Sequence, residues 1–206
     1  MDIITRITRQ RGKMQIAISE QETIVVPLSL FRERPLTEGQ PINLEEYDNW
    51  LMVRQYRHAL DRAVACLAAR AHSKHEIEQK LLRVGYRPCT VEMVLYKLER
   101  EHLLNDADFA RQWVEARSGR KLGRSRIAQE LRRKGIDADE AEEALSAIGE
   151  DAQLADAIAL AEKAAARAKS DEDPSKTYQR IAAMLARRGF RWDITKEALA
   201  QVLQAD

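Results

Sequence analysis

Three stretches of the chain carry the same residue pattern, and each is centred on a glycine: Gly85, Gly135 and Gly189. An isoleucine stands eight residues before each glycine, a leucine stands four before it, and a bulky apolar residue follows it. Two more apolar residues stand ten and thirteen positions after it. The glycines are 50 and 54 residues apart, a spacing that is typical of tandem helical repeats, which form extended binding surfaces rather than catalytic pockets. The matching positions hold Ile77, Ile127 and Ile181, Leu81, Leu131 and Leu185, Tyr86, Ile136 and Phe190, Leu95, Leu145 and Leu199, and Leu98, Ile148 and Val202.

Each copy predicts three helices. The isoleucine and leucine, four residues apart, share one face of the middle helix. The glycine ends that helix, because glycine adopts the left-handed conformation of a helix C-terminus at the lowest cost. The residue twelve positions before the glycine suits an N-cap, and these residues are Ser73, Gly123 and Thr177. We expect the third helices to begin near Thr90, Asp137 and Asp193, and the first helices to span about 51–69, 106–118 and 150–168.

Residues 1 to about 35 differ from the repeats because apolar and polar residues alternate there. A period of two predicts strands, in an antiparallel meander of two or three, with turns at Gly12 and at Glu20-Gln21. Pro27 predicts an edge strand or an early strand end. A sheet this small is marginal alone, so we expect it to dock on the first helix or on a partner. The alternating apolar residues are Met14, Ile16 and Ile18, then Ile24, Val26, Leu28 and Leu30.

A linker with Pro35, Gly39 and Pro41 leads into a long helix that we expect to end near residue 69. Asn43 and Glu46 form a capping-box pattern at its start. Its apolar residues recur at steps of three and four, which predicts one apolar face. That face consists of Val53, Tyr56, Leu60, Val64 and Leu67.

The predicted fold is therefore mainly α, an elongated tandem array of three three-helix repeats with a small N-terminal antiparallel β unit. We expect the β-meander and linker to span residues 1–42, and the three repeats to span 43–104, 105–149 and 150–206. The charged loop at residues 171–174 is the flexible joint that we expect within the array.

Composition and short motifs exclude several classes of function. The net charge is only +1, so an argument for nucleic-acid binding has to rest on local clustering of charge. No apolar run approaches the ~18–20 residues of a membrane span, and no signal peptide is apparent, so we expect a cytoplasmic chain with Cys66 and Cys89 reduced. No catalytic motif or zinc-ligand spacing occurs, which predicts neither an enzyme nor a cofactor or metal. We expect His72 and His75 to be solvated beside an N-cap.

The strongest local charge signal lies in the second repeat, and we call it the basic strip. A strip of this density can neutralise phosphates or dock on an acidic protein surface, and the alternative is a solvated helix face with ordinary ion pairs. The basic strip consists of Arg111, Arg117, Arg120, Lys121, Arg124, Arg126, Arg132, Arg133 and Lys134, interrupted only by Glu115 and Glu130 as acidic residues. The candidate partner- or DNA-binding residues are Arg117, Arg120, Lys121, Arg124, Arg126, Arg132, Arg133 and Lys134, joined by Arg187 and Arg188 of a smaller cluster in repeat three.

A helix, a glycine turn and a second helix also resemble a helix-turn-helix. The signal is weak, because the second helices lack the concentration of Asn, Gln and Arg that base readout needs. We expect Trp50, Trp113 and Trp192 to serve in packing. Phe109 and Trp113 lie one turn apart on one face, which favours a core position over a base-stacking platform.

Several motifs resemble the RecX family of bacterial regulatory proteins. The most specific are LLNDADFA at 103–110, Ala116-Arg117, and GRSRIAQELRRKGI at 123–136. Ser73-Lys74 with Ile77, and Lys80-Leu81-Leu82 with Gly85-Tyr86, match the first repeat of the family. The resemblance covers about residues 55–204 and leaves out the N-terminal strands.

The resemblance implies a tandem three-helix-repeat protein that lies in the groove of the RecA–DNA filament and inhibits its strand exchange, ATP hydrolysis and co-protease activity. It thus implies a non-enzymatic, monomeric, cytoplasmic regulator of RecA in homologous recombination, DNA repair and the SOS response. The expected partners are the RecA filament and, weakly or through the filament, single-stranded DNA, with no membrane involved. The alternative function is a stand-alone DNA-binding protein that uses helix-turn-helix-like repeats.

Overall fold

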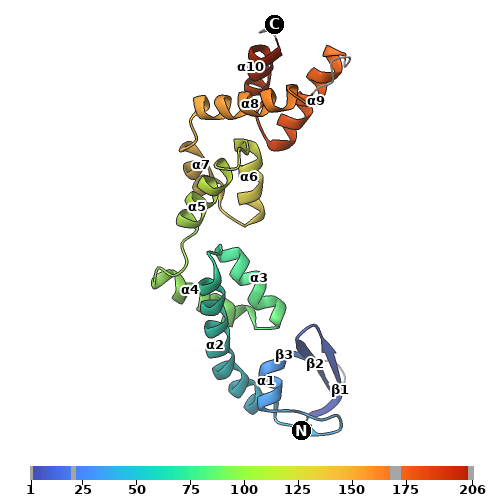
Figure 1. Cartoon of the computed structure of the whole chain (residues 1–206). Coiled ribbons are helices and arrows are strands. Elements are labelled where there is room, and N and C mark those ends of the chain that lie inside the picture. Colours follow the sequence, from blue (N-terminus) through green and yellow to red (C-terminus); the bar gives the residue numbers. More distant parts are fainter. Residues whose placement is uncertain (1, 20–21, 168–172, 204–206) are drawn as a thin grey trace. The chain divides into compact units, whose positions relative to one another are not determined.

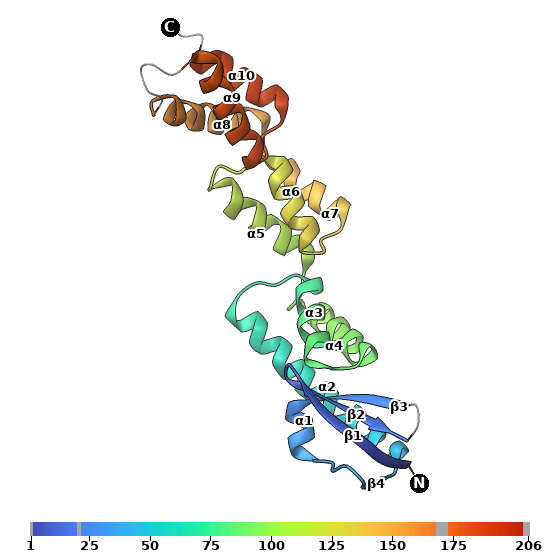
Figure 2. The ribbon, with the colours of Figure 1, turned by 90° about the vertical axis from the view of Figure 1, so that its right-hand side faces the viewer.

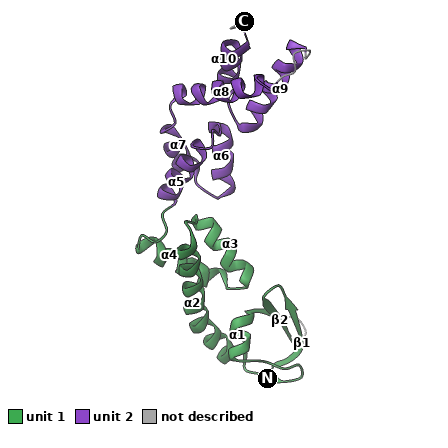
Figure 3. Ribbon diagram, in the orientation of Figure 1, with its two compact units in different colours: residues 1–105 green, residues 106–206 purple. Residues whose placement is uncertain are grey.

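The structure is a computed structural model that describes residues 2–19, 22–167 and 173–203. The chain divides into two compact units, Met1–Asn105 and Asp106–Asp206 (Figure 3). The first unit holds the β-sheet and helices α1 to α4, and the second holds helices α5 to α10 (Figure 1). The predicted fold class is confirmed, because the chain is mainly helical with a small N-terminal antiparallel sheet.

The N-terminal sheet has the strand order β3-β2-β1-β4, and its paired neighbours are antiparallel (Figure 2). Gly12 has a φ of +90° and makes the predicted turn between β1 and β2. The turn predicted at Glu20-Gln21 lies outside the described residues. The strands are β1 (Asp2–Gln10), β2 (Lys13–Ile18), β3 (Glu22–Pro27) and β4 (Pro41–Ile42).

Strand β3 lies at the edge of the sheet and ends at Pro27, as predicted. The prediction that Leu28 and Leu30 continue this strand was wrong, because both belong to the short helix α1 (Leu28–Glu33). Proline ends the pairing of the strand, and the helical turn that follows buries Leu30 completely. The predicted linker also contributes β4, which pairs with the start of β1.

The sheet docks on the first long helix, α2 (Leu44–Ala69), as predicted. Ile4, Ile16 and Tyr47 belong to one continuous core that joins the sheet to the helices of the first unit. A Cβ atom added to Gly85 would lie 3.0 Å from Cγ1 of Val25, so the β2–β3 hairpin rests on the turn that ends α3 (Lys74–Val84). The first repeat and the sheet are therefore one folding unit.

The buried face of α2 differs from the predicted one. The predicted cap is confirmed, because the side chain of Asn43 accepts a hydrogen bond of 3.2 Å from the amide of Glu46. Val53 is 76% exposed and Val64 is 42% exposed, so assigning them to the core-facing stripe was wrong. Tyr56, Leu60 and Leu67 of the predicted stripe are partly buried against the core of the first unit. The buried residues of α2 are Tyr47, Leu51, Gln55, Ala59 and Ala63.

Each repeat consists of three helices, and the first helix packs on the third in every case. This places α2 on α4, α5 on α7 and α8 on α10 (Figures 1 and 2). Repeat one adds α3 (Lys74–Val84) and α4 (Pro88–Arg100) to α2. Repeat two contains α5 (Asp106–Ser118), α6 (Arg124–Arg133) and α7 (Ala138–Ser146). Repeat three contains α8 (Glu150–Ala165), α9 (Pro174–Arg188) and α10 (Trp192–Leu203).

The repeated apolar positions form the three cores. The isoleucine and leucine before each glycine are at most 1% exposed, and the bulky residue after it is 5% exposed in all three copies. Gly85, Gly135 and Gly189 have φ values of +100°, +75° and +90°, the region in which a side chain is strained. The predicted role of the glycines as helix stops is therefore confirmed.

Two predictions in repeat three were wrong. Thr177 is not an N-cap: α9 begins at Pro174, and the Asp173 side chain accepts a 2.8 Å hydrogen bond from the amide of Ser175. Proline suits the first position of a helix and aspartate suits the cap, so this start is favoured over one at Thr177. Trp192 is 63% exposed rather than packed. The predicted end of the first helix at residue 168 and most of the predicted joint at 171–174 lie outside the described residues.

Candidate functional site

Helix α6 begins where α9 ends, and we call this contact the α6–α9 seam. The amide of Gly123 donates to the carbonyl of Arg188 at 2.9 Å, and the amide of Ser125 donates to the carbonyl of Gly189 at 3.2 Å. The positive end of one helix dipole thus meets the negative end of another, which is favourable. A Cβ atom on Gly123 would lie 2.2 Å from the carbonyl carbon and oxygen of Gly189, so the seam requires glycine there.

A buried glutamine completes the start of α6. Gln153 of α8 is 3% exposed, and its Oε1 accepts a hydrogen bond of 2.9 Å from the amide of Arg124. Three successive amides at the N-terminus of α6 are therefore already bonded within the protein. They are not open to a phosphate, which helix N-termini otherwise attract. Gln153 was not predicted as part of the site, because its only signal in the sequence is an amide side chain on an Ala-rich helix.

The seam brings the basic residues of repeats two and three together. Nη1 of Arg188 lies 3.3 Å from the backbone oxygen of Arg120 and 3.4 Å from that of Lys121, and donates to both. Arg188 and Arg120 are 68 positions apart in the sequence. The two clusters that the sequence predicts separately thus adjoin within the second unit.

Arg117 belongs to a partly buried cluster around Trp113. Its Nε donates to Oε2 of Glu130 at 2.6 Å, and its guanidinium lies 4.0 Å from the centre of the Trp113 ring. The amino group of Lys134 lies 4.6 Å from the same ring centre. Nε1 of Trp113 donates to the same oxygen of Glu130, Oε2, at 3.2 Å. Nε of Arg126 lies 3.5 Å from the other carboxylate oxygen of Glu130, Oε1. For these cations the alternative of ordinary structural ion pairs fits the geometry.

The surroundings of Glu130 explain its charge state. Burial by itself would raise the pKa of Glu130, but the hydrogen bond and charge of Arg117 lower it, with help from Trp113 and Arg126. The net effect is a pKa below the ordinary value of 4.5. The carboxylate therefore stays ionised and holds the cluster together.

Two further cations of the strip pair with residues outside it. Arg124 forms an ion pair with Glu142 of α7. Nζ of Lys121 lies 3.2 Å from Oδ1 of Asp156 on α8. These partners are 18 and 35 positions away in the sequence, so local charge counting could not reveal them.

Four of the candidate residues remain open to a partner: Arg120, Arg132, Arg133 and Arg187. All four are exposed, and their side chains form no ion pair or hydrogen bond with any residue that the structure describes. An exposed guanidinium that has no internal partner can donate two parallel N–H bonds to one carboxylate or phosphate. The open part of the candidate site is therefore smaller than the sequence predicts.

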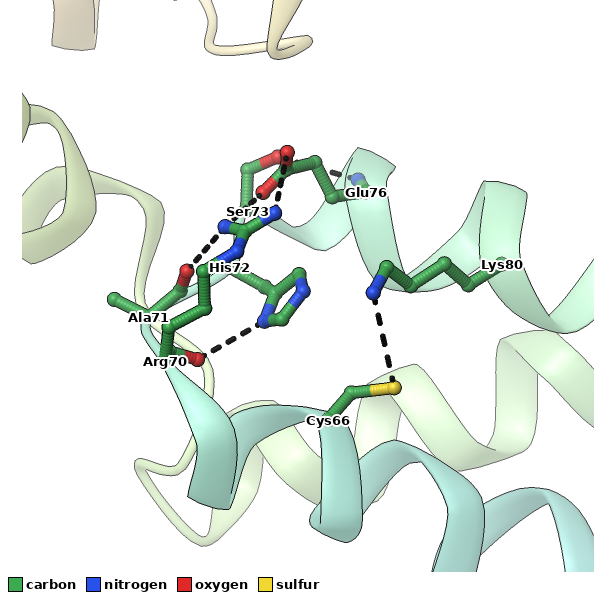
Figure 4. A network of polar contacts seen from close by, with 7 residues as sticks. All are labelled: Cys66, Arg70, Ala71, His72, Ser73, Glu76 and Lys80. Atoms are coloured by element: carbon green, nitrogen blue, oxygen red, sulfur yellow. Dashed lines mark hydrogen bonds and ion pairs between the residues drawn. The ribbon is translucent and has the colours of Figure 1, made fainter.

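His72 does not have the solvated environment predicted for it. The side chain is 4% exposed and lies between the end of α2 and the start of α3, beside Lys80 and Cys66 (Figure 4). Its Nδ1 donates to the carbonyl of Arg70 at 2.9 Å, and Nε2 has no hydrogen-bond partner among the described residues. Burial lowers the pKa of His72, and the positive charges of Arg70 and Lys80 add to this.

An ion pair and a helix cap flank this histidine. Both terminal nitrogens of Arg70 bond Glu76, at 3.1 and 3.2 Å, and the Ser73 side chain caps α3 through the amide of Glu76 at 3.2 Å (Figure 4). His75, in contrast, is exposed, as predicted. Within the described ranges, no group of three or more His, Cys, Asp or Glu side chains is placed to hold a metal ion. No helix in the same ranges is both long and apolar enough to span a membrane.

Comparisons with known proteins agree on one family. The chain matches the first, second and third three-helix domains of RecX over residues 59–98, 105–145 and 151–199. A regulatory protein RecX from Clostridioides difficile is 31% identical over 210 residues, spanning 100% of this chain and 98% of the relative. One from Mycobacteroides abscessus is 38% identical over 65% of this chain and 68% of the relative.

Two crystal structures share the fold. The structure of RecX from Lactobacillus salivarius has a TM-score of 0.68 and 25% identity, and the match covers 73% of this chain and 97% of that one. A second crystal structure of a regulatory protein RecX covers 100% of both chains, with a TM-score of 0.67 and 21% identity.

Proposed function

The chain belongs to the RecX family of regulatory proteins, as its motifs predict, and we propose that it regulates the RecA recombinase by binding the RecA–single-stranded DNA filament. On this proposal it inhibits ATP hydrolysis, strand exchange and co-protease activity of the filament, and acts without catalytic chemistry of its own. One observation supports this most: arginines of repeats two and three lie exposed, without an ion pair to any described residue, on a surface held by the α6–α9 seam.

The charge of this surface suits a filament of protein and nucleic acid. Such a filament presents phosphates and acidic side chains, and each unpaired arginine can bind either group. Contacts of this kind are individually weak, but repeats joined in one chain bind at a high effective concentration. Repeats two and three therefore favour a multivalent contact, to which Arg120, Arg132, Arg133 and Arg187 contribute.

Stand-alone DNA binding through helix-turn-helix-like repeats is the alternative, and repeat two argues against it. The helix that would enter the groove is α7, which exposes Asp139, Glu142 and Glu143. Carboxylates on that face repel the phosphates of a duplex. The amides at the start of α6 are bonded to the α9 carbonyls and to Gln153, so they do not favour a phosphate either.

The proposal is tested by adding the protein to RecA filaments and measuring ATP hydrolysis and strand exchange, beside a control with single-stranded DNA alone. The double variant Arg132→Glu/Arg133→Glu should weaken binding to the filament roughly tenfold or more, since it replaces two positive charges that pair with no described residue by negative ones. The matched control is Arg54→Glu/Arg57→Glu on α2, where both arginines are exposed and no ion pair to a described residue is found.

No effect of the wild-type protein at a stoichiometric ratio would refute the proposed function. Equal losses of filament affinity in the two double variants would show that binding depends on the net charge of the protein and not on this surface. Tight binding to DNA without RecA, with a steep dependence on salt, would favour the alternative.

A further inference from the structure

A groove of about 900 Å³ runs along the second unit between α6, α7 and the end of α9. Its floor is aliphatic: Ile136 and Leu145 line it and are 5% and 2% exposed, and Ala128 and Ala141 line it as well. Three arginines line it as well, namely Arg126 and Arg132 from α6 and Arg187 from α9. The groove therefore combines an apolar floor with positive charge contributed by two different repeats.

The α6–α9 seam forms this groove in advance. Gly189 lines the groove, and its carbonyl accepts a hydrogen bond from the amide of Ser125, which also lines the groove. A Cβ atom on Gly189 would lie 2.4 Å from the backbone nitrogen of Arg126, so the two walls are in backbone contact. A groove held by backbone contacts needs little ordering when a ligand binds, which favours affinity.

The charge in the groove is unbalanced. Arg132 and Arg187 form no ion pair within the described part of the chain. Arg126 makes two long contacts of 3.5 Å, one to Glu130 and one to the neutral side chain of Gln129. Among the described residues that line the groove, Glu142 is the single acidic one, and it already pairs with Arg124. The groove therefore has an excess of positive charge, which the carboxylates of a ligand can neutralise.

The residue types that line the groove favour a protein ligand over a nucleic acid. Single-stranded nucleic acids stack their bases on aromatic side chains, and the described residues that line this groove include no aromatic one. Small and branched aliphatic side chains instead match the apolar face of a helix laid in a groove. Alanines at positions 128, 138, 141 and 186 leave room for larger side chains of a ligand.

We propose that this groove binds an acidic amphipathic helix of a partner protein, with the apolar face on the Ile136–Leu145 floor and carboxylates on Arg132 and Arg187. The inference rests on the proposed function only for the identity of the partner, which is then a helix of the recombinase filament. The binding chemistry itself follows from the groove.

Two designed helical peptides test the groove directly. They carry the same leucine face, and one has glutamates where the other has lysines on both flanks. Isotope-labelled protein is titrated with each peptide, and the backbone amide shifts of Ala138 and Ala186 report on the groove, while that of Ala147, at the other end of α7 and outside the groove, serves as the control. The glutamate peptide should bind at least tenfold more tightly than the lysine peptide and should shift Ala138 and Ala186 but not Ala147.

The charge variant Arg132→Glu/Arg187→Glu should reverse the preference between the peptides, whereas Arg54→Glu/Arg57→Glu should leave it unchanged. Equal affinity for both peptides, shifts that map elsewhere, or displacement of the glutamate peptide from Ala138 and Ala186 by a single-stranded oligonucleotide would overturn the inference. If the groove binds the glutamate peptide while the protein leaves RecA filaments unaffected, the proposed function fails and the groove assignment stands. If the filament is inhibited and the groove binds neither peptide, the groove assignment fails and the proposed function stands.

Discussion

The α6–α9 seam makes a sharp prediction about Gly123→Ala. Gly123 has φ −71° and ψ 152°, which alanine adopts without strain, so the backbone conformation adds no cost. The added Cβ atom would lie 2.2 Å from the carbonyl of Gly189, where ordinary contact begins at 3.4 Å. Because the opposing atoms are backbone, no side chain can rotate away, and the two helix ends must separate by about 1.2 Å.

The loss of stability follows from what that separation breaks. Two hydrogen bonds across the seam, of 2.9 and 3.2 Å, contribute about 1 kcal/mol each. Forcing an extra methyl group into a packed contact costs a further ~1–3 kcal/mol. We therefore expect Gly123→Ala to lower the free energy of unfolding of the second unit by about 3 kcal/mol or more.

Gly149→Ala is the matched control for this change. Gly149 is also the N-cap of a helix, with φ −66° and ψ 150°, and a Cβ atom there meets nothing within 4 Å. Its expected effect is within about 0.5 kcal/mol, since the small loss at the cap is offset by a less flexible unfolded chain. The two variants thus differ mainly in the space around the new methyl group.

Urea unfolding followed by tryptophan fluorescence measures both variants. Trp113 and Trp192 report on the second unit, and a Trp50→Phe background removes the signal of the first. If Gly123→Ala and Gly149→Ala differ by less than about 1 kcal/mol, the reasoning from the seam is wrong.

Three further predictions concern the other buried polar groups. Gln153→Leu removes the acceptor of the Arg124 amide, so it should cost about 1–2 kcal/mol and speed hydrogen exchange at that amide. Gln153→Glu keeps an acceptor, and an equal speeding of exchange there would contradict the role of Gln153. Because the pKa of Glu130 is lower in the folded than in the unfolded state, its stabilisation is present above its ordinary value of 4.5 and is lost as the pH falls through the folded value. As the pH is lowered from about 6 to 3, the urea midpoint of Glu130→Gln should therefore fall less than that of the wild-type protein. An equal fall in the two proteins would refute this. Because the pKa of His72 is lowered, the unfolded chain takes up its proton first, and the first unit should lose stability as the pH falls below about 6.5. His72→Gln should flatten this dependence, measured by Trp50 fluorescence between about pH 7.5 and 5.5, and an unchanged slope would count against it.

Much of the fold could be predicted because the repeat signal is local. A helix buries residues spaced three and four apart, and a glycine after them ends it, so Ile127, Leu131 and Gly135 report on their own helix. The prediction of which face of α2 is buried was wrong for the opposite reason. Both faces of that helix carry apolar residues, and only the neighbours of α2 decide that Ala59 is buried and Val53 is exposed.

The candidate site was predictable as a region but not as a set of free charges. The density of arginines around Gly123 is visible in the sequence, and so is the smaller cluster at Arg187. Which cations are already paired depends on Glu142 and Asp156, which approach from other helices. The same holds for His72, whose burial depends on how α2 and α3 meet.

The sequence by itself determined the family, the three-helix repeats, their glycine stops and the position of the basic strip. All of these depend on residues within one or two helical turns of each other, where spacing fixes geometry. Only the tertiary structure decided that Gly123 and Gly189 touch, that four arginines of the two clusters find no ion-pair partner among the residues the structure describes, and that an apolar groove opens beside them. Those features arise from atoms far apart in the chain, whose contact depends on the packing of whole helices rather than on any local pattern.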